Sequence, residues 1–565
     1  MPRSFVPVLC AAATLLAQQA KLAPPSPADY GQWEQFISYG PVNTFSPDGK
    51  WLAYGINRAN GNNEMRVVNL STGATVTTLP FGEDPAFSED SHFFAYSIGL
   101  SESQTEKLRK DKKPVQKKLG LLNLSSAQET VIPAIESFAF SPNGQFLAMR
   151  QYAPEKKDAP ATPPSPVEDE PPPTGATLIV RQLANARDFT FGNVSAFAWQ
   201  HWRTQGHLLA MIINTAATEQ TGNSVQLFDE PAGTLRVLDS ASASYSGLAW
   251  RKDSNDLAFL CSKTDDKHQG ATNIAIAFTH LAEPSEAAHR FDPTTAGAPF
   301  PAGVRVASSH TPTWSDDAQT IFLGLNDWRD KPPAKEKDAV KEKDKEEDEP
   351  AAVSVWHWRD TEVMPHQKLS ARRNSDRTML AAWHLDSGAF TQLGHSLLDE
   401  SVSPLRHQSL AWAADWKQYA LERSIGRPAA DIYLIDTATG TRTKVHDRLI
   451  EDRQLEASPN GSYLLYLQDN QYWTVNTATH AAVNITSKIK TSFVDRESDF
   501  TSQITPPLWP GRLDQRRGSR YSLRQVRSME SRSRWQPSRA PHRWRRTRNP
   551  PSLSPPRSGG GIHRS

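Results

Sequence analysis

The segment Phe45-Ser-Pro-Asp-Gly-Lys-Trp-Leu-Ala-Tyr54 places a tight-turn sequence between two strand-like flanks. Pro-Asp-Gly favours a tight turn, because proline fixes one φ angle and the next residues accept left-handed geometry. The aromatic and Leu-Ala-Tyr flanks are typical of paired strands. The segment therefore predicts a β-hairpin.

This hairpin sequence recurs along the chain, which makes it a structural repeat rather than a single turn. Two close copies are Phe87-Ser-Glu-Asp-Ser-His-Phe-Phe-Ala-Tyr96 and Phe140-Ser-Pro-Asn-Gly-Gln-Phe-Leu-Ala-Met149, and weaker copies begin at Trp199, Trp250, Trp314, Trp412 and Ala457. Successive copies are 42, 53, 59, 51, 64, 98 and 45 residues apart, close to one four-stranded blade each once insertions are allowed. A second hairpin follows several copies, at residues 67–75, 434–442 and 473–479.

Two hairpins per repeat predict an all-β chain, a β-propeller of seven or eight blades over residues 30–504, with the possibility that the ring is incomplete. The aromatic residue that opens most copies is expected to pack adjacent blades together. These residues are Phe45, Phe87, Phe140, Trp199, Trp250, Trp314 and Trp412.

Three segments interrupt the repeat with compositions that are poor in core-forming residues. Residues 102–118 are charged, residues 154–173 are rich in proline and acids, and residues 329–350 are a run of Lys, Glu and Asp. Such compositions predict disordered, solvated insertions between strands. The charged run at residues 335–338 also allows a partner-binding segment, although a flexible loop is the simpler interpretation.

The overall composition is that of a packed protein: 565 residues, 38% hydrophobic, with a mean hydropathy of −0.58. Residues 1–20 are typical of a signal peptide, with Arg3 followed by an apolar stretch too short for a membrane span and then small residues near Ala20. We therefore expect a periplasmic or secreted protein without a membrane span. Only Cys10 and Cys261 are present, so no disulfide framework is expected.

The C-terminal 54 residues, 512–565, differ in charge from the rest of the chain. They hold 15 Arg, no Lys and only Asp514 and Glu530, a net charge of +13, whereas the remainder has 48 basic and 60 acidic residues. They also lack an apolar period and begin where a further hairpin is due. This pattern predicts a disordered basic tail.

Three interpretations of this tail remain open. If permitted codons for residues 513–536 are shifted forward by one nucleotide, they can encode another propeller hairpin, so the tail can be an out-of-frame remnant. It can equally be a native disordered tail. Nucleic-acid binding through Arg543-Trp-Arg-Arg-Thr-Arg548 is disfavoured, because an exported protein has little reason to meet nucleic acid.

The repeated Ser-Pro-Asp-Gly hairpins behind a signal peptide resemble the propeller of secreted prolyl oligopeptidase-family serine peptidases, including the dipeptidyl-peptidase and acylaminoacyl-peptidase branches. They also resemble the propeller of the periplasmic Tol-associated protein. The long insertions and Trp356-His-Trp-Arg-Asp360 favour the peptidase. In that family the propeller precedes an α/β-hydrolase domain and restricts which substrates reach it.

The resemblance implies a catalytic serine on a Gly-x-Ser-x-Gly elbow, but no such pentapeptide occurs in this sequence. We therefore predict no catalytic residue, no cofactor and no metal ligand, and an inactive, substrate-gating propeller portion truncated before its hydrolase. The alternative is a stand-alone propeller that serves as a protein-binding scaffold. The expected partner is a peptide substrate or a protein. Cys261 is expected to be a buried core residue, and His201, His207, His357 and His366 are expected to be loop or rim residues.

Overall fold

The computed structural model describes residues 26–37, 44–154, 174–215, 222–295, 300–331, 360–405, 408–424, 428–450, 455–458, 460–489 and 493–494. The expected signal peptide, most of the insertions at 154–173 and 329–350, and the basic tail lie outside these residues. The chain forms two compact units, one of Met1–Leu455 with Ser502–Ile504 and one of Glu456–Thr501 with Thr505–Ser565. Each unit is described by itself.

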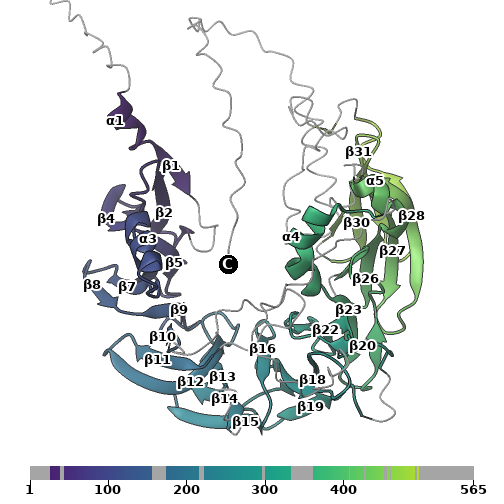
Figure 1. The fold of residues 1–565 in the computed structure, drawn as a ribbon, viewed down its shortest axis with the longest axis horizontal. Coiled ribbons are helices and arrows are strands. Elements are labelled where there is room, and N and C mark those ends of the chain that lie inside the picture. The colour runs from purple at the N-terminus through teal and green to yellow at the C-terminus, as the bar shows by residue number, and fades with distance from the viewer. Residues whose placement is uncertain are drawn as a thin grey trace, which may run out of the picture. The chain divides into compact units, whose positions relative to one another are not determined.

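The first unit is built from antiparallel sheets whose four-stranded repeats follow one another along the chain (Figure 1). Two successive repeats share one seven-stranded sheet, and one repeat forms a five-stranded sheet. The first three repeats contain β1 (Glu34–Ile37), β2 (Trp51–Arg58), β3 (Glu64–Asn69) and β4 (Ala74–Pro80); β5 (Gly82–Phe87), β6 (Phe93–Ile98), β7 (Lys118–Asn123) and β8 (Glu129–Ile132); and β9 (Ile135–Phe140), β10 (Phe146–Gln151), β11 (Ala176–Gln182) and the first half of β12 (Arg187–Trp199). In each, neighbours in sequence are neighbours in the sheet.

The next four repeats have the same order. They contain the second half of β12 with β13 (Leu208–Ile213), β14 (Asn223–Asp229) and β15 (Thr234–Ala241); β16 (Tyr245–Trp250), β17 (Leu257–Thr264), β18 (Ala271–Thr279) and β19 (Ala287–Phe291); β20 (Val304–Val306), β21 (Thr313–Trp314), β22 (Thr320–Asp327), β23 (Met379–His384) and β24 (Phe390–Gln392); and β25 (Glu400–Pro404), β26 (Leu410–Asp415), β27 (Ala429–Asp436) and β28 (Arg442–Ile450). The first unit thus holds seven four-stranded repeats among its described residues.

Two repeats deviate from the simple pattern. Strand β12 pairs with β11 through residues 187–194 and with β13 through residues 194–199, so one long strand joins the third and fourth repeats. In the sixth repeat the first strand is interrupted: β20 and β21 both pair with β22, and residues 307–312 lie between them.

The second unit repeats the meander once more, with β29 (Glu456–Ala457), β30 (Tyr463–Gln468), β31 (Gln471–Asn476) and β32 (Ala482–Asn484). Tyr472 packs its ring against Phe493, 5.4 Å away and edge-on, within a small core that also contains Leu465 and Leu467. The fold is therefore an all-β propeller fold, as the hairpin repeat predicts.

The core lies between successive sheets of the first unit. The second strand of each repeat is an almost continuous apolar run, such as Leu208–Ile213, because both of its faces are covered. One buried cluster joins the first two repeats through Met65 and Phe94, and another joins the fifth and sixth through Leu260 and Leu323. Burial between neighbouring sheets is thus the main stabilising contact of the unit.

The Ser-Pro-Asp-Gly turns have a common hydrogen-bonding pattern that the turn residues alone do not predict. The serine hydroxyl donates to the Asp or Asn two residues later, at 2.6–2.8 Å, and accepts the N–H five residues later, at 2.8–3.0 Å. The serines are Ser46, Ser88, Ser141, Ser315 and Ser458, all buried. The buried serine therefore fixes each turn from the inside, which a Pro-Asp-Gly turn by itself does not require.

The opening aromatic residues are only partly as expected. The indoles of Trp199, Trp250 and Trp314 donate to Ala139 O, Ala198 O and Ala249 O of the preceding repeat, at 3.1, 3.0 and 2.9 Å. Phe87 and Phe140 pack against buried clusters, also as predicted.

The prediction is wrong for Phe45 and Trp412. Phe45 is 46% exposed. Trp412 lies on the second strand, β26, because the turn of the seventh repeat is at residues 405–409, where the sequence has no Ser-Pro-Asp.

The expectation of disorder at residues 102–118 also needs correction, because α3 (Glu102–Lys110) is a helix. Ser101 and Gln104 form a capping box, in which each side chain bonds the other's backbone. Basic residues occupy the last turn, where the negative end of the helix dipole stabilises positive charge. The segment is solvent-exposed as expected, since no residue of α3 is buried. A charged composition therefore excluded a core position but not a helix.

Candidate partner-binding face

The two ends of the sheets in the first unit carry different kinds of connection. Because the strands alternate in direction, the links from first to second and from third to fourth strand lie at one end, which we call the turn face. The links from second to third strand, and from one repeat to the next, lie at the other end, which we call the loop face. Each face therefore collects chemically distinct segments.

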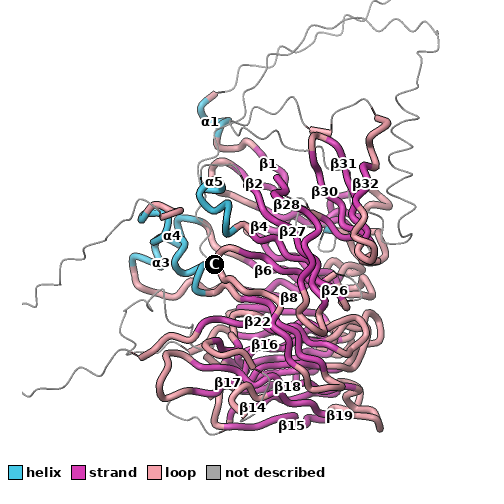
Figure 2. Tube along the Cα trace, turned by 90° about the vertical axis from the view of Figure 1, so that its right-hand side faces the viewer, coloured by secondary structure: helices cyan, strands magenta, loops and turns pink. Residues whose placement is uncertain are grey.

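Long connections occur between second and third strands and hence on the loop face. The helix α3 joins β6 to β7, α4 (Met364–Ser375) lies between β22 and β23, and η1 (Lys417–Tyr419) with α5 (Ala420–Ser424) joins β26 to β27. Figure 2 shows α3, α4 and α5 on the same side of the strands. The expected insertions fall in the same class of link, so the loop face is where this chain departs most from a minimal propeller.

On the turn face, hydrogen bonds join the turns of neighbouring repeats. They run from Asp48 N to Ser91 Oγ (3.2 Å), Thr204 N to Pro142 O (3.0 Å), Asp253 N to His201 O (2.8 Å), Arg251 Nη1 to Asp316 O (3.2 Å) and Asp316 N to Gln408 Oε1 (2.7 Å). Between the second and third repeats, Gly144 packs directly on the backbone of Asp90.

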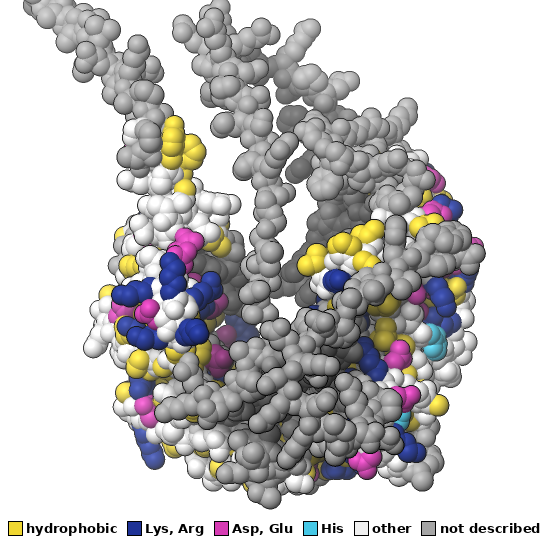
Figure 3. Space-filling view, in the orientation of Figure 1, with side chains coloured by type: hydrophobic (Ala, Val, Ile, Leu, Met, Phe, Trp, Pro, Cys, Tyr) yellow, Lys and Arg dark blue, Asp and Glu magenta, His cyan; other side chains and the backbone are white. Residues whose placement is uncertain are grey.

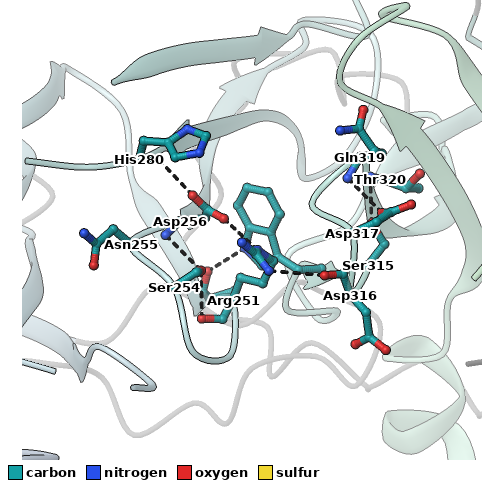
Figure 4. A network of polar contacts seen from close by, with 12 residues as sticks. Arg251, Ser254, Asn255, Asp256, His280, Ser315, Asp316, Asp317, Gln319 and Thr320 are labelled. Atoms are coloured by element: carbon teal, nitrogen blue, oxygen red, sulfur yellow. Dashed lines mark hydrogen bonds and ion pairs between the residues drawn. The ribbon is translucent and has the colours of Figure 1, made fainter. Parts of the chain in front are cut away.

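Figure 4 shows one of these junctions, where Arg251 lies between Asp256 and Asp316. The Arg251 guanidinium is 2.6 Å from the carboxylate of Asp256, a residue that is 2% exposed. Asp256 also accepts the N–H of His280 from the next turn of the same repeat. A buried charge that is paired in this way holds the fifth and sixth repeats together.

Glu230, at the turn between β14 and β15, is a second buried carboxyl of the turn face. It is 5% exposed, and both of its oxygens accept from Asn143 Nδ2 of the preceding repeat, at 3.1 Å. Burial raises the pKa of Glu230 to about 7, against the lowering effect of Asn143. This contact between repeats therefore changes its charge near neutral pH.

The loop face carries a group of exposed cations on and after α3. Figure 3 shows Lys and Arg side chains gathered over this helix. Lys107, Arg109, Lys112 and Lys113 are exposed, while Lys110 forms an i,i+4 pair with Glu106 at 3.8 Å. These residues make this part of the face suitable for an acidic partner surface.

A cavity of about 150 Å³ opens between the sixth and seventh repeats on the loop face. Its lining combines polar groups with apolar strand residues: His310, Thr378, Met379, Leu380, Gly394, Ser396, Glu400, Ser401 and Val402. His310 comes from the interruption of the first strand at residues 307–312. Burial lowers the pKa of His310, so its imidazole is neutral at pH 7.

A second cavity, of about 320 Å³, lies between the fifth and sixth repeats. Trp328 forms one wall and stacks on His268, with ring centroids 4.6 Å apart. Phe300 and two prolines make the rest of the lining largely apolar.

The groups singled out from the sequence do not form a catalytic site among the described residues. Cys261 is 2% exposed and burial raises its pKa, so it is a core residue as predicted. His201 and His366 are exposed and His207 is at the surface of a turn, as predicted, while His357 lies outside the described residues.

Within the described part of the chain, no group of three His, Cys, Asp or Glu side chains is placed to hold a metal ion, and no helix is both long and apolar enough to cross a membrane. The sequence analysis missed His310, Glu230 and the turn-face network. The missed signal was the pairing of a buried Ser with an Asp or Asn two residues later.

No protein-family model and no curated protein matches the sequence. Solved structures that resemble it include a eukaryotic initiation factor (12% identity, TM-score 0.36, covering 78% of this chain and 85% of that one) and the propeller domain of the trilobed protease from Pyrococcus furiosus (10%, 0.28, 71% and 95%). A prolyl endopeptidase is also similar (11%, 0.32, 80% and 55%), so this chain spans about half of that enzyme. With such low scores, the propeller assignment rests on the strand order and register.

Proposed function

We propose that this chain is the substrate-gating propeller portion of an exported prolyl oligopeptidase-like serine peptidase, and that it handles peptides without cleaving them. The observation that carries the proposal is the division between the two faces. The turn face repeats the same short turn with its Ser and Asp or Asn contacts, whereas the loop face carries the helices, the long links and the cavity at His310.

The direction of the strands within a repeat also supports the proposal. The first strand of a repeat begins, and its fourth strand ends, at the loop end of the sheet. A domain joined to the chain before β1 therefore connects at the loop end of the sheet of β1. A domain joined after β32 connects at the loop end of the sheet of β32 in its own unit. In a gated peptidase this is the end at which substrate selection has to occur.

The chain by itself is expected to be catalytically inactive. Its sequence has no Gly-x-Ser-x-Gly pentapeptide, and its buried Cys261 is not available as a nucleophile. We therefore expect the purified chain to release no product from a panel of fluorogenic dipeptide and acylaminoacyl substrates. Turnover that survives further purification would contradict the proposal.

The origin of the chain can be tested at the level of the gene. We propose that residues 512–565 are an out-of-frame remnant and that the intact product is periplasmic or secreted. Resequencing across the codons for residues 510–516 should reveal a frame error, with a Gly-x-Ser-x-Gly elbow encoded downstream in the shifted frame. A confirmed frame with no hydrolase downstream would reject the truncated peptidase.

The alternative function is a stand-alone protein-binding scaffold, and the exposed cations of α3 are the observation that favours it. A scaffold would bind an acidic protein surface through Lys107, Arg109, Lys112 and Lys113, with a strong dependence on salt. Charge reversal of these four residues separates the two functions. It would abolish scaffold binding but leave peptide binding elsewhere on the loop face unchanged.

A further inference from the structure

The cavity at His310 arises where the sixth repeat departs from the others. Its first strand is broken between β20 and β21, and residues 307–312 leave the sheet before the strand resumes. The opposing residue on β22 is Gly324, where a Cβ atom would lie 2.3 Å from His310 Cβ and 2.8 Å from Thr378 Cβ. The absence of a side chain at Gly324 is thus what allows His310 to occupy this position.

The imidazole of His310 is inserted without a firm partner among the described residues. Its Nε2 is buried and has no hydrogen-bond partner, and its Nδ1 is 3.5 Å from Thr378 Oγ1, at the limit of a hydrogen bond. Buried polar side-chain atoms are paired in most proteins, so the unpaired Nε2 of a residue that lines the cavity leaves one hydrogen bond unmade beside it.

The charge of the cavity is already balanced from within. The side chain of Glu400 is 3% exposed, and its Oε1 is 2.6 Å from Arg442 Nη1. Its Oε2 accepts the N–H of His395 at 2.8 Å. Glu400 and Arg442 already neutralise each other, and His310 is neutral. A charged ligand would therefore lose its hydration without gaining an opposite charge, so the cavity favours a neutral ligand.

The size and the remaining walls restrict the ligand further. A volume of about 150 Å³ accommodates roughly five water-sized groups. Leu380 and Val402 provide an apolar side, while the imidazole, Thr378 and the exposed Ser401 provide both donors and acceptors. The ligand is therefore small, neutral, and able to donate and accept hydrogen bonds at one end.

We propose that this cavity binds a carboxamide group, with His310 as its main polar contact. Both a Gln or Asn side chain and a main-chain amide present this chemistry. The inference rests on the proposed function in one respect, since a peptide is the molecule expected to bring the amide to the loop face.

The test uses the full chain and ligand-observed NMR titrations with three small probes. N-acetylglutamine methylamide should bind saturably. N-acetylglutamate methylamide should bind at least about tenfold more weakly than the glutamine probe, because its carboxylate would be buried beside the Glu400 pair. If N-acetylalanine methylamide binds as well as the glutamine probe, the source is the main-chain amide, and if it does not, the source is the side chain.

Variants assign the binding to this cavity. The substitution His310→Ala should remove binding of the glutamine probe, while His92→Ala, at a histidine whose side chain is 69% exposed on the turn face, should leave it unchanged. If His310→Ala does not fold, Ser401→Leu at the exposed rim should block the cavity instead. Equal binding by a folded His310→Ala or Ser401→Leu variant, or no saturable binding of any probe, overturns the proposal.

The same titrations separate this inference from the proposed function. If a longer peptide binds the chain and His310→Ala does not weaken it, the carboxamide site fails and peptide handling stands. If the glutamine probe binds at His310 but no peptide binds the chain, the site stands and the peptidase-type function fails.

Discussion

The turn face and the loop face of the first unit differ in how regular their connections are. At the turn face the same Ser and Asp or Asn contacts recur, and backbone groups of one turn bond the next turn. At the loop face the links vary from short turns to segments with helices such as α3 and α4. Hydrogen bonds between repeats occur at the loop end too, as from Asn273 Nδ2 to Val306 O at 2.8 Å, so the two ends differ in their regularity. The same turn recurs at one end, whereas the links at the other end vary and can form a specific site.

If the turn face holds the repeats together, filling one of its tight junctions should have the largest effect. Gly144 has φ +76°, and a Cβ atom there would lie 3.0 Å from the backbone nitrogen of Asp90. We expect Gly144→Ala to lower the free energy of unfolding by about 3 kcal/mol, because left-handed strain adds to overpacking. Denaturant unfolding monitored by tryptophan fluorescence measures this loss.

Gly49 is the matched control for that experiment. It occupies the same position of its own turn with φ +71°, but no atom lies within 4 Å of the position that a Cβ atom would take there. Gly49→Ala should therefore cost only the strain, about 1 kcal/mol. Equal losses for both variants would show that contact between the turns contributes nothing.

The second effect concerns pH at the junction of Glu230 with Asn143. The folded pKa of Glu230, about 7, is above the ordinary glutamate value of 4.5, so the folded state holds a proton that the unfolded state releases first. Stability from this group is therefore fully present below about pH 4.5, falls as the pH rises towards 7, and stays low above that pH, by on the order of 2–3 kcal/mol.

The substitution Glu230→Gln should remove that dependence and raise stability at pH 8 relative to the parent chain. Unfolding midpoints measured between pH 4.5 and 8 provide the readout. Glu106→Gln, at an exposed position of α3, should leave the parent's pH profile intact. A Glu230→Gln profile that falls as steeply as the parent's would mean that the charge of Glu230 does not cause the pH dependence.

Much of the fold was readable from the sequence because its signal is local. An aromatic residue, a turn residue and an apolar strand lie within ten residues of each other, so each close copy predicts its own hairpin. The copy at Trp412 was misplaced because the seventh repeat has no Ser-Pro-Asp at its turn, and its aromatic residue lies on β26 instead. Where the local signal is lost, register can be assigned only from pairing with neighbouring strands.

The cavity could not be predicted in the same way, because its residues come from distant links. His310, Thr378 and Glu400 are brought together only when β22 pairs with β23 and the sheet of β25 packs beside β23. No single window of sequence contains them, and a lone histidine in a loop is more often a solvated residue. Glu230 was missed for the same reason, since its partner Asn143 is 87 residues away.

A smaller effect is expected from the indole hydrogen bonds near the turn face. Trp314→Phe keeps most of the ring but removes the 2.9 Å bond to Ala249 O of the preceding repeat. The loss should be about 1–2 kcal/mol, because a carbonyl in a partly buried position is left unpaired. Trp33→Phe, at a residue that is 60% exposed, should change the unfolding midpoint by much less. Equal changes would assign the Trp314 effect to ring size rather than to the bond between repeats.

The smallest effect should come from the loop face. Ser101 accepts the Gln104 N–H at 3.2 Å and begins α3, which has no buried residue. Ser101→Ala should cost about 1 kcal/mol of helix stability. Because α3 packs no side chain into the core, that loss should remain local: hydrogen exchange should speed up at residues 102–110 while β6 and β7 keep their protection and the global unfolding midpoint does not move. Faster exchange in β6 and β7 as well would mean that the loop face supports the sheets, and that the division between a structural turn face and a free loop face is wrong.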